Sequence, residues 1–182
     1  ETEITSEEGI EVFQNEKYFF LKKNVKIFSD NFVLLGDEIK IYFDKDLYDV
    51  KKINAVGNVS LDSKLYKLSA SGEKLIFIIE NEEILIEGVA STLNTESANM
   101  FSHGSIKVNN IAGNFSIKGS ESQLKSEDIF IEGYEINGVF ESGNMQEIQL
   151  LDVFDEKLSF IKTENTEMYA KKVNYNKENS LI

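Results

Sequence analysis

The sequence contains no cysteine and no proline, and it has one histidine. The lack of cysteine excludes a disulfide framework, a thiolate zinc site and a thiol nucleophile. The lack of proline means that no strand loses a backbone donor to that residue, and it excludes collagen-like and proline-rich segments. His103 lies between Ser102 and Ser105, but neighbouring strand residues point to opposite faces. We therefore expect a turn or surface histidine rather than a catalytic base, and no metal site.

Long apolar runs and basic residues are also scarce. No run approaches the roughly 18 apolar residues of a membrane-spanning helix. Acids outnumber bases 32 to 19, which disfavours binding to the phosphates of nucleic acid. Acid pairs such as Glu82–Glu83 and Glu7–Glu8 lie in polar turn segments and predict a solvated surface rather than general acid–base catalysis. We predict a non-enzymatic protein without cofactor or metal.

The sequence does contain ample apolar material in a strand-like pattern. Hydrophobic residues make up 41% of the chain, and 13 are Phe. Apolar residues alternate with polar ones in runs such as Ile39 to Phe43, and turn residues such as Asp44-Lys45-Asp46 separate the runs. This pattern predicts an all-β fold of many short antiparallel strands. We expect one extended domain over residues 1–182, with a weak candidate boundary near residues 133–143, where glycines cluster.

Two short sequence motifs, which we call phrases, alternate along the chain with a period of about 30 residues. The first has glycine or lysine, then asparagine, then an apolar residue, as in Lys23-Asn24-Val25 and Gly57-Asn58-Val59, with further forms at Gly88-Val89 and Gly113-Asn114. We predict that it opens a strand. The second has small or acidic residues before an alternating strand, as in Gly36-Asp37-Glu38. A two-strand unit of this size buries its apolar face only when it stacks on its neighbours.

These phrases resemble the OstA-like, or LptA-like, β-jellyroll family of the lipopolysaccharide transport system. The resemblance rests on Ile53 to Val59 and Leu68 to Phe77, with Glu3 to Glu7 as a first strand. It implies a V-shaped roll of antiparallel strands around an apolar groove. Family members include a periplasmic bridge, the periplasmic part of an inner-membrane component and the amino-terminal domain of an outer-membrane receptor, and the sequence does not separate these three.

The resemblance also implies a function. The chain would be a periplasmic bridge that binds lipopolysaccharide through its lipid A acyl chains, stacks head to tail with copies of itself, and passes lipid between the inner-membrane anchor and the outer-membrane receptor. Because the chain begins at Glu1 rather than Met, we expect a removed signal peptide or anchor. The lipid-binding residues predicted from the family match and from alternation are Ile4, Val25, Ile27, Ile39, Ile41, Val59, Leu61, Leu75, Phe77, Ile79, Ile84 and Ile86.

Other interpretations of the same pattern remain. A groove wall and an ordinary core wall show the same alternation, so the chain could instead be a structural or adhesin-like β-solenoid without a lipid cavity. An enzyme acting on polysaccharide is a third alternative, and it would require a clustered acid pair in a cleft. Lys22 and Lys23 offer a hypothetical contact for anionic head groups at the mouth of a groove.

Overall fold

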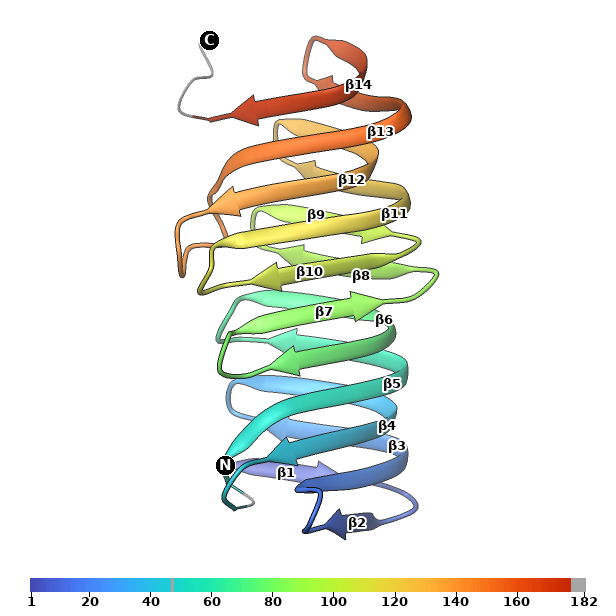
Figure 1. Ribbon diagram of the computed structural model, residues 1–182, viewed down its shortest axis with the longest axis vertical. Coiled ribbons are helices and arrows are strands. Elements are labelled where there is room, and N and C mark those ends of the chain that lie inside the picture. The colour runs from blue at the N-terminus through green and yellow to red at the C-terminus, as the bar shows by residue number, and fades with distance from the viewer. Residues whose placement is uncertain (47, 178–182) are drawn as a thin grey trace.

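The computed structural model describes residues 1–46 and 48–177, and all of its regular elements are strands joined into one 14-stranded antiparallel sheet. The sheet folds over on itself into a tall roll whose strands run across the long axis, with β1 and β2 at one end and β14 at the other (Figure 1). The strands are β1 (Thr2–Thr5), β2 (Ile10–Phe13), β3 (Tyr18–Ser29), β4 (Phe32–Phe43), β5 (Val50–Ser63), β6 (Leu68–Ile78), β7 (Glu83–Glu87), β8 (Ser91–Thr95), β9 (Ala98–Ser102), β10 (Ser105–Asn109), β11 (Asn114–Ser126), β12 (Ile129–Phe140), β13 (Ile148–Thr163) and β14 (Glu167–Asn176).

The roll has two walls. The front wall contains β2, β7 and β10, and the rear wall contains β1, β8 and β9 (Figure 1). The long strands β3, β4, β5, β6, β11, β12, β13 and β14 cross from one wall to the other, so each contributes one half to each wall. The prediction of an all-β fold with many antiparallel strands is confirmed. Several strands are longer than expected, since β13 alone runs for 16 residues.

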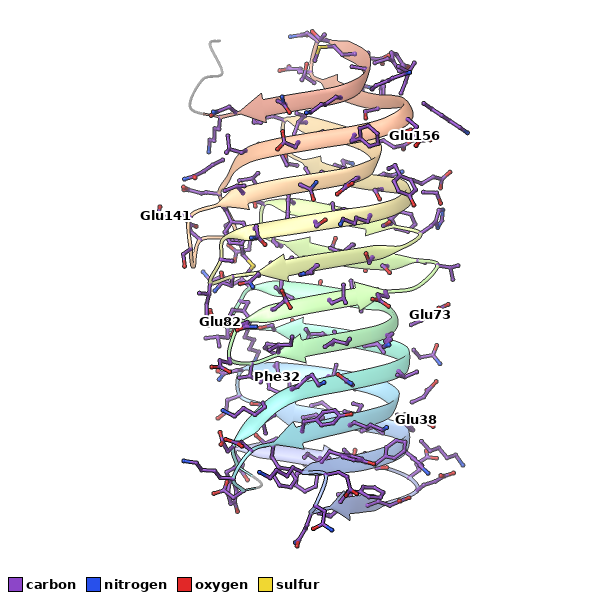
Figure 2. The ribbon with its side chains drawn as sticks, viewed as in Figure 1. Phe32, Glu38, Glu73, Glu82, Glu141 and Glu156 are labelled. Carbon is purple, nitrogen blue, oxygen red and sulfur yellow. The ribbon has the colours of Figure 1, made fainter. Side chains whose placement is uncertain are left out.

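We call the line along which the strands bend the corner. There the register of β3, β4, β5, β11, β12 and β13 shifts, as it does between Val56 and Val59 where β5 meets β6. A bulge with an extra residue bends a strand and increases its twist, which turns the chain from the front wall to the rear wall. Glu38, Glu73 and Glu156 mark this side of the roll in Figure 2.

The first repeated phrase builds the corner, which corrects its predicted role. Asn24, Gly57 and Asn58 all have positive φ and lie inside β3 and β5 rather than at their starts, and Gly88 links β7 to β8. The copies at Gly88-Val89 and Gly113-Asn114 do come at the start of a strand, before β8 and at the beginning of β11. Glycine and asparagine adopt the left-handed backbone at low cost, so they allow the bend.

The two phrases meet at the corner through side chains. Asn58 Nδ2 donates to Asp37 Oδ2 over 3.0 Å, and Asn24 Nδ2 donates to Glu7 Oε1 over the same distance. Each asparagine therefore donates to an acid of the neighbouring layer, on β4 for Asn58 and in the link between β1 and β2 for Asn24, while its backbone makes the bend. The spacing of the phrases reflects the spacing of the corner bends.

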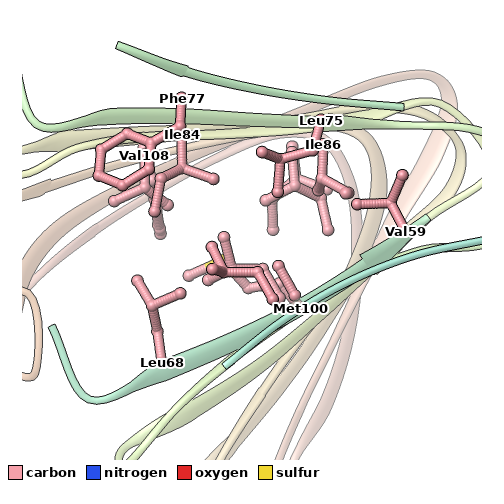
Figure 3. Close-up of a cluster of buried hydrophobic side chains, with 14 of the residues drawn as sticks. Val59, Leu68, Leu75, Phe77, Ile84, Ile86, Met100 and Val108 are labelled. Atoms are coloured by element: carbon pink, nitrogen blue, oxygen red, sulfur yellow. The ribbon is translucent and has the colours of Figure 1, made fainter. Parts of the chain in front are cut away.

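The side opposite the corner carries the turns, and we call it the mouth. Glu82 and Glu141 lie on this side in Figure 2. Turns of the front wall, such as residues 79–82 and 110–113, face turns of the rear wall, such as residues 64–67. The space between the walls is filled by side chains from both (Figure 3).

Candidate functional site

The interior between the walls is lined by two apolar ladders that run through the whole sheet. Because neighbouring strands are in register, inward side chains stand side by side from strand to strand. The front ladder is Ile10, Leu21, Ile39, Ala55, Leu75, Ile86, Ile106, Ile117, Ile136, Val153 and Val173. The rear ladder is Ile4, Ile27, Leu34, Leu61, Ala70, Leu93, Met100, Leu124, Ile131, Ile161 and Met168.

All twelve predicted lipid-binding residues face this interior or pack against it. Ten of them are at most 6% exposed: Val25, Ile27, Ile39, Ile41, Val59, Leu61, Leu75, Phe77, Ile84 and Ile86. Ile4 and Ile79 are partly buried against the same cluster. Val59, Leu75, Phe77, Ile84 and Ile86 of the set lie together in one part of the interior (Figure 3), and the others continue along the same core. Binding of lipid by these residues stays a prediction.

The apolar interior continues beyond the predicted set into the second half of the chain. Phe115, Ile117, Leu124, Ile136 and Val153 are at most 3% exposed and belong to the same cluster. Alternation at Phe115 and Ile117 is visible in the sequence and could have identified them. Gly138 stands opposite Phe115, and a Cβ there would overlap its ring, so the glycine makes room for the aromatic side chain.

At the amino-terminal end the ladders open to solvent. Ile4, Ile10, Val12, Phe19 and Leu21 line an apolar cleft of about 260 Å³. Ile10 is 54% exposed and Val12 is 49% exposed, whereas Leu21, the next member of the front ladder, is 1% exposed. The cleft is therefore the place where the buried interior reaches the surface at this end.

The mouth is covered over part of its length by polar contacts and a loop. Tyr66 Oη donates to Glu82 Oε1 across the mouth over 3.2 Å. Burial, followed by the charge and hydrogen bond of Glu82, raises the pKa of Tyr66 to about 12, so the phenol remains a donor. The loop at residues 141–147 places Met145 in the apolar cluster with 8% exposure.

His103 lies at the corner, on the outside of the roll. Its Nδ1 contacts the Val89 carbonyl oxygen, and its Nε2 lies 2.7 Å from Glu121 Oε2. The hydrogen bond to Val89, and then that to Glu121, raises the pKa of the imidazole. Ser102 Oγ is engaged with the Lys118 carbonyl oxygen and with Ser122. His103 thus joins three segments at the corner.

The lysine pair lies away from the mouth. Lys22 and Lys23 are at the corner bend of β3, where Lys23 has a φ of 65°. Lys22 Nζ lies 3.6 Å from Glu11 Oε1, and Lys23 Nζ lies 3.6 Å from Glu7 Oε2. These lysines therefore lie on the side of the roll opposite the turns, and contact between them and lipid head groups stays a prediction.

Metal-binding clusters and membrane-spanning helices are both absent from residues 1–46 and 48–177. These residues contain no cluster of three or more His, Cys, Asp or Glu side chains that could hold a metal ion. The same part of the chain has no helix long and apolar enough to cross a membrane.

Comparisons with known proteins give a likeness in structure but none in sequence. No family model matches the sequence, and no curated protein matches it. Among solved structures, the chain is similar to LptH of Pseudomonas aeruginosa, described as the LptA-homologous periplasmic component of the lipopolysaccharide transport device. The match has a TM-score of 0.36 and 10% identity, and it covers 96% of this chain and 94% of that one.

Proposed function

We propose that this chain is a lipid-binding bridge that shelters the acyl chains of lipopolysaccharide between its two walls and passes the lipid along the roll. The observation that carries the proposal is the pair of continuous apolar ladders, each of which reaches the surface at one end: the front ladder at its first member and the rear ladder at its last. Ile10 is 54% exposed at one end, and Met168 is 47% exposed at the other. The repeated phrases of the sequence resemble those of the lipopolysaccharide transport system, which supports the choice of lipid.

The physical basis is the burial of methylene groups. Each methylene transferred from water to an apolar environment contributes roughly 0.8 kcal/mol, and the interaction has no preferred direction. Each ladder of apolar side chains in register therefore offers successive, nearly equivalent binding positions to an acyl chain. Lipid would enter by separating the walls and displacing contacts between the two ladders.

In this proposal the protein is periplasmic and works in a row of stacked rolls. Within residues 1–46 and 48–177, β2 pairs with β3 alone and β14 pairs with β13 alone, so both ends of this part of the chain present strand edges. Such edges add a further strand from another molecule readily. The partners would be other copies of the chain, the inner-membrane anchor component and the outer-membrane receptor.

Photo-crosslinking at two adjacent residues of β3 tests the proposal. Phe19 lines the amino-terminal cleft, whereas its neighbour Phe20 faces outward, where Lys22 and Lys40 lie over its ring. A benzophenone amino acid replaces each in turn, and the protein is irradiated with purified lipopolysaccharide. We expect adducts from position 19 and none from position 20, and adducts again from Phe77 as an interior position.

The second candidate is a structural module without a lipid cavity, and the packing of the interior favours it. Ile39, Ile86 and Ile106 are 0% exposed because side chains from both walls already fill the space. A module of this kind gives no adduct at Phe19 or Phe77. It also fails to bind an apolar fluorescent dye that lipopolysaccharide can displace. That pair of results would replace the bridge with the structural module.

A further inference from the structure

A second cleft lies at the mouth, halfway along the roll, and it is polar where the amino-terminal cleft is apolar. Its volume is about 390 Å³. The rear wall contributes the turn between β5 and β6, and the front wall contributes Glu82, Asn110 and part of the loop at residues 141–147. The residues around it are Leu65, Tyr66, Lys67, Glu82, Asn110, Gly143, Asn144, Met145 and Gln146.

Two residues of this cleft carry buried hydrogen-bond acceptors that lack a donor in the structure. Asn110 is 8% exposed, and its Nδ2 donates to Glu82 Oε2 over 3.1 Å, which leaves its Oδ1 buried without a partner. Gln146 donates through Nε2 to the Lys67 carbonyl oxygen, and its Oε1 is also buried without a partner. Buried acceptors without donors are rare in folded proteins, and each is satisfied by water or by a ligand that donates.

The carboxylate of Glu82 lies among these acceptors and sets the charge that the cleft accepts. It already receives hydrogen bonds from Tyr66 and Asn110, so it stays oriented toward them. An anionic group would face this carboxylate and two amide oxygens, with Lys67 as the one basic residue among those around the cleft. An ammonium group, or a sugar with several hydroxyls, can by contrast donate to these oxygens.

Met145 connects the polar cleft to the apolar interior. Its side chain belongs to the core cluster although it comes from a loop rather than a strand. The loop is tied to the front wall by the Gly143 amide, which donates to the Asn110 carbonyl oxygen over 2.9 Å. The contact from Gln146 Nε2 to Lys67 on the rear wall is long, at 3.5 Å. The loop is therefore held more closely to the front wall than to the rear wall.

We propose that this cleft binds the hydrogen-bond-donating head group of an amphiphile, such as the hydroxyls of a sugar, with Met145 marking where the attached chain enters the interior. The inference rests on the proposed function for the apolar chain, and it adds the class of head group that the mouth selects. Asn110 and Gln146 supply the selecting acceptors.

A set of amphiphiles with the same chain and different head groups tests this selection. The probes are dodecyl glucoside, whose head donates, dodecanoate, whose head is anionic, and dodecyltrimethylammonium, whose head is cationic without donors. Binding is measured by displacement of an apolar dye, below the micelle concentrations. We expect the glucoside to bind roughly tenfold more tightly than the other two, the ratio that one or two good hydrogen bonds give.

The variants Asn110→Leu and Gln146→Met should remove this preference by weakening the binding of the glucoside. Gln149→Met is the matched control, because Gln149 lies on β13 outside the cleft, and it should keep the preference. Equal binding of all three probes by the natural sequence, or a preference that survives both variants, would overturn the head-group site and leave the bridge standing. Binding of none of the probes would remove the bridge and the head-group site together.

Discussion

At the scale of single residues, polar side chains gather where the strands bend. Ser102 and Ser122 are 0% exposed and bond to one another over 3.0 Å, and Ser122 also donates to the Gly119 carbonyl oxygen over 2.8 Å. Bulges leave backbone carbonyls without ladder partners, and these hydroxyls supply the missing donors. Ser159 occupies a similar buried position, and its hydroxyl has no partner. Hydrogen bonds from individual side chains, rather than regular backbone pairing between strands, therefore stabilise the corner.

His103 makes the corner sensitive to pH. Its folded-state pKa is raised above the ordinary value of 6.5 by Val89 and Glu121. The stabilisation from its protonated ring is therefore fully present below about pH 6.5 and is lost as the pH rises through the raised folded pKa. We expect His103→Gln to lower the melting temperature at pH 5.5 and to have little effect at pH 8.5.

Glu121→Gln is the companion variant for this prediction, because it removes the carboxylate and keeps the shape. It should lower the pKa of His103 in an NMR titration of the ring. An unchanged titration would show that Glu121 does not hold the imidazolium.

At the scale of elements, the bend in the middle of each long strand gives the sheet its shape. Gly57 is the clearest case, because its φ is 82° and a Cβ there would overlap the side chain of Asp37. The same aspartate accepts the hydrogen bond from Asn58. One short phrase therefore sets the backbone bend and the contact between β4 and β5.

Gly57→Ala should lower the free energy of unfolding by about 3 kcal/mol, since it combines left-handed strain of about 1–2 kcal/mol with displacement of Asp37. Gly143→Ala is the matched control, because Gly143 has a φ of 81° but a Cβ at this position would meet no atom within 4 Å. It should cost about 1 kcal/mol, the backbone strain alone. Urea unfolding of both variants measures the difference, and equal losses would contradict the role given to Asp37.

Alternation in the sequence predicted which residues of several strands point inward. For other residues the sequence could not predict burial, for physical reasons. Ile39 and Ile41 alternate cleanly and are buried. Leu75 to Ile78 is apolar on both faces, so the sequence alone did not show that Leu75 and Phe77 point inward. Gly57-Asn58 has the composition of a strand boundary, because the residues that end strands also bend them. The burial of Met145 was invisible, since its loop carries no periodic pattern.

At the scale of the whole molecule, the two ends of the roll, as residues 1–46 and 48–177 form them, differ in character. The amino-terminal end exposes Ile10 and Val12 beside a free strand edge, while the carboxy-terminal end exposes Met168 and Tyr169 of β14. Apolar residues beside free edges favour contact between copies of the chain. Over the rest of the outer surface, two copies repel each other because each has a net charge of −13. Association is therefore expected at the ends and along one axis.

Val12→Glu should prevent this association. In sedimentation velocity experiments we expect the mean mass of the natural chain to rise with concentration, and that of Val12→Glu to stay at one copy. Val89→Glu is the control, because Val89 is 67% exposed at the corner, far from the free edges in the sheet order. If Val89→Glu dissociates the assembly equally, net charge rather than the end surface governs it.

The order of the strands in the sheet has a consequence for how the molecule forms. β3, β4, β5 and β6 lie side by side in chain order, as do β10 to β14. Even among the more widely separated partners, Thr2 pairs with Ser29 and Ala98 with Ser126. Closing such short loops costs little entropy, so each layer can settle on the one before it without waiting for the distant end of the chain. The roll can therefore fold progressively from its amino-terminal end to its carboxy-terminal end, in the order in which the polypeptide is synthesised.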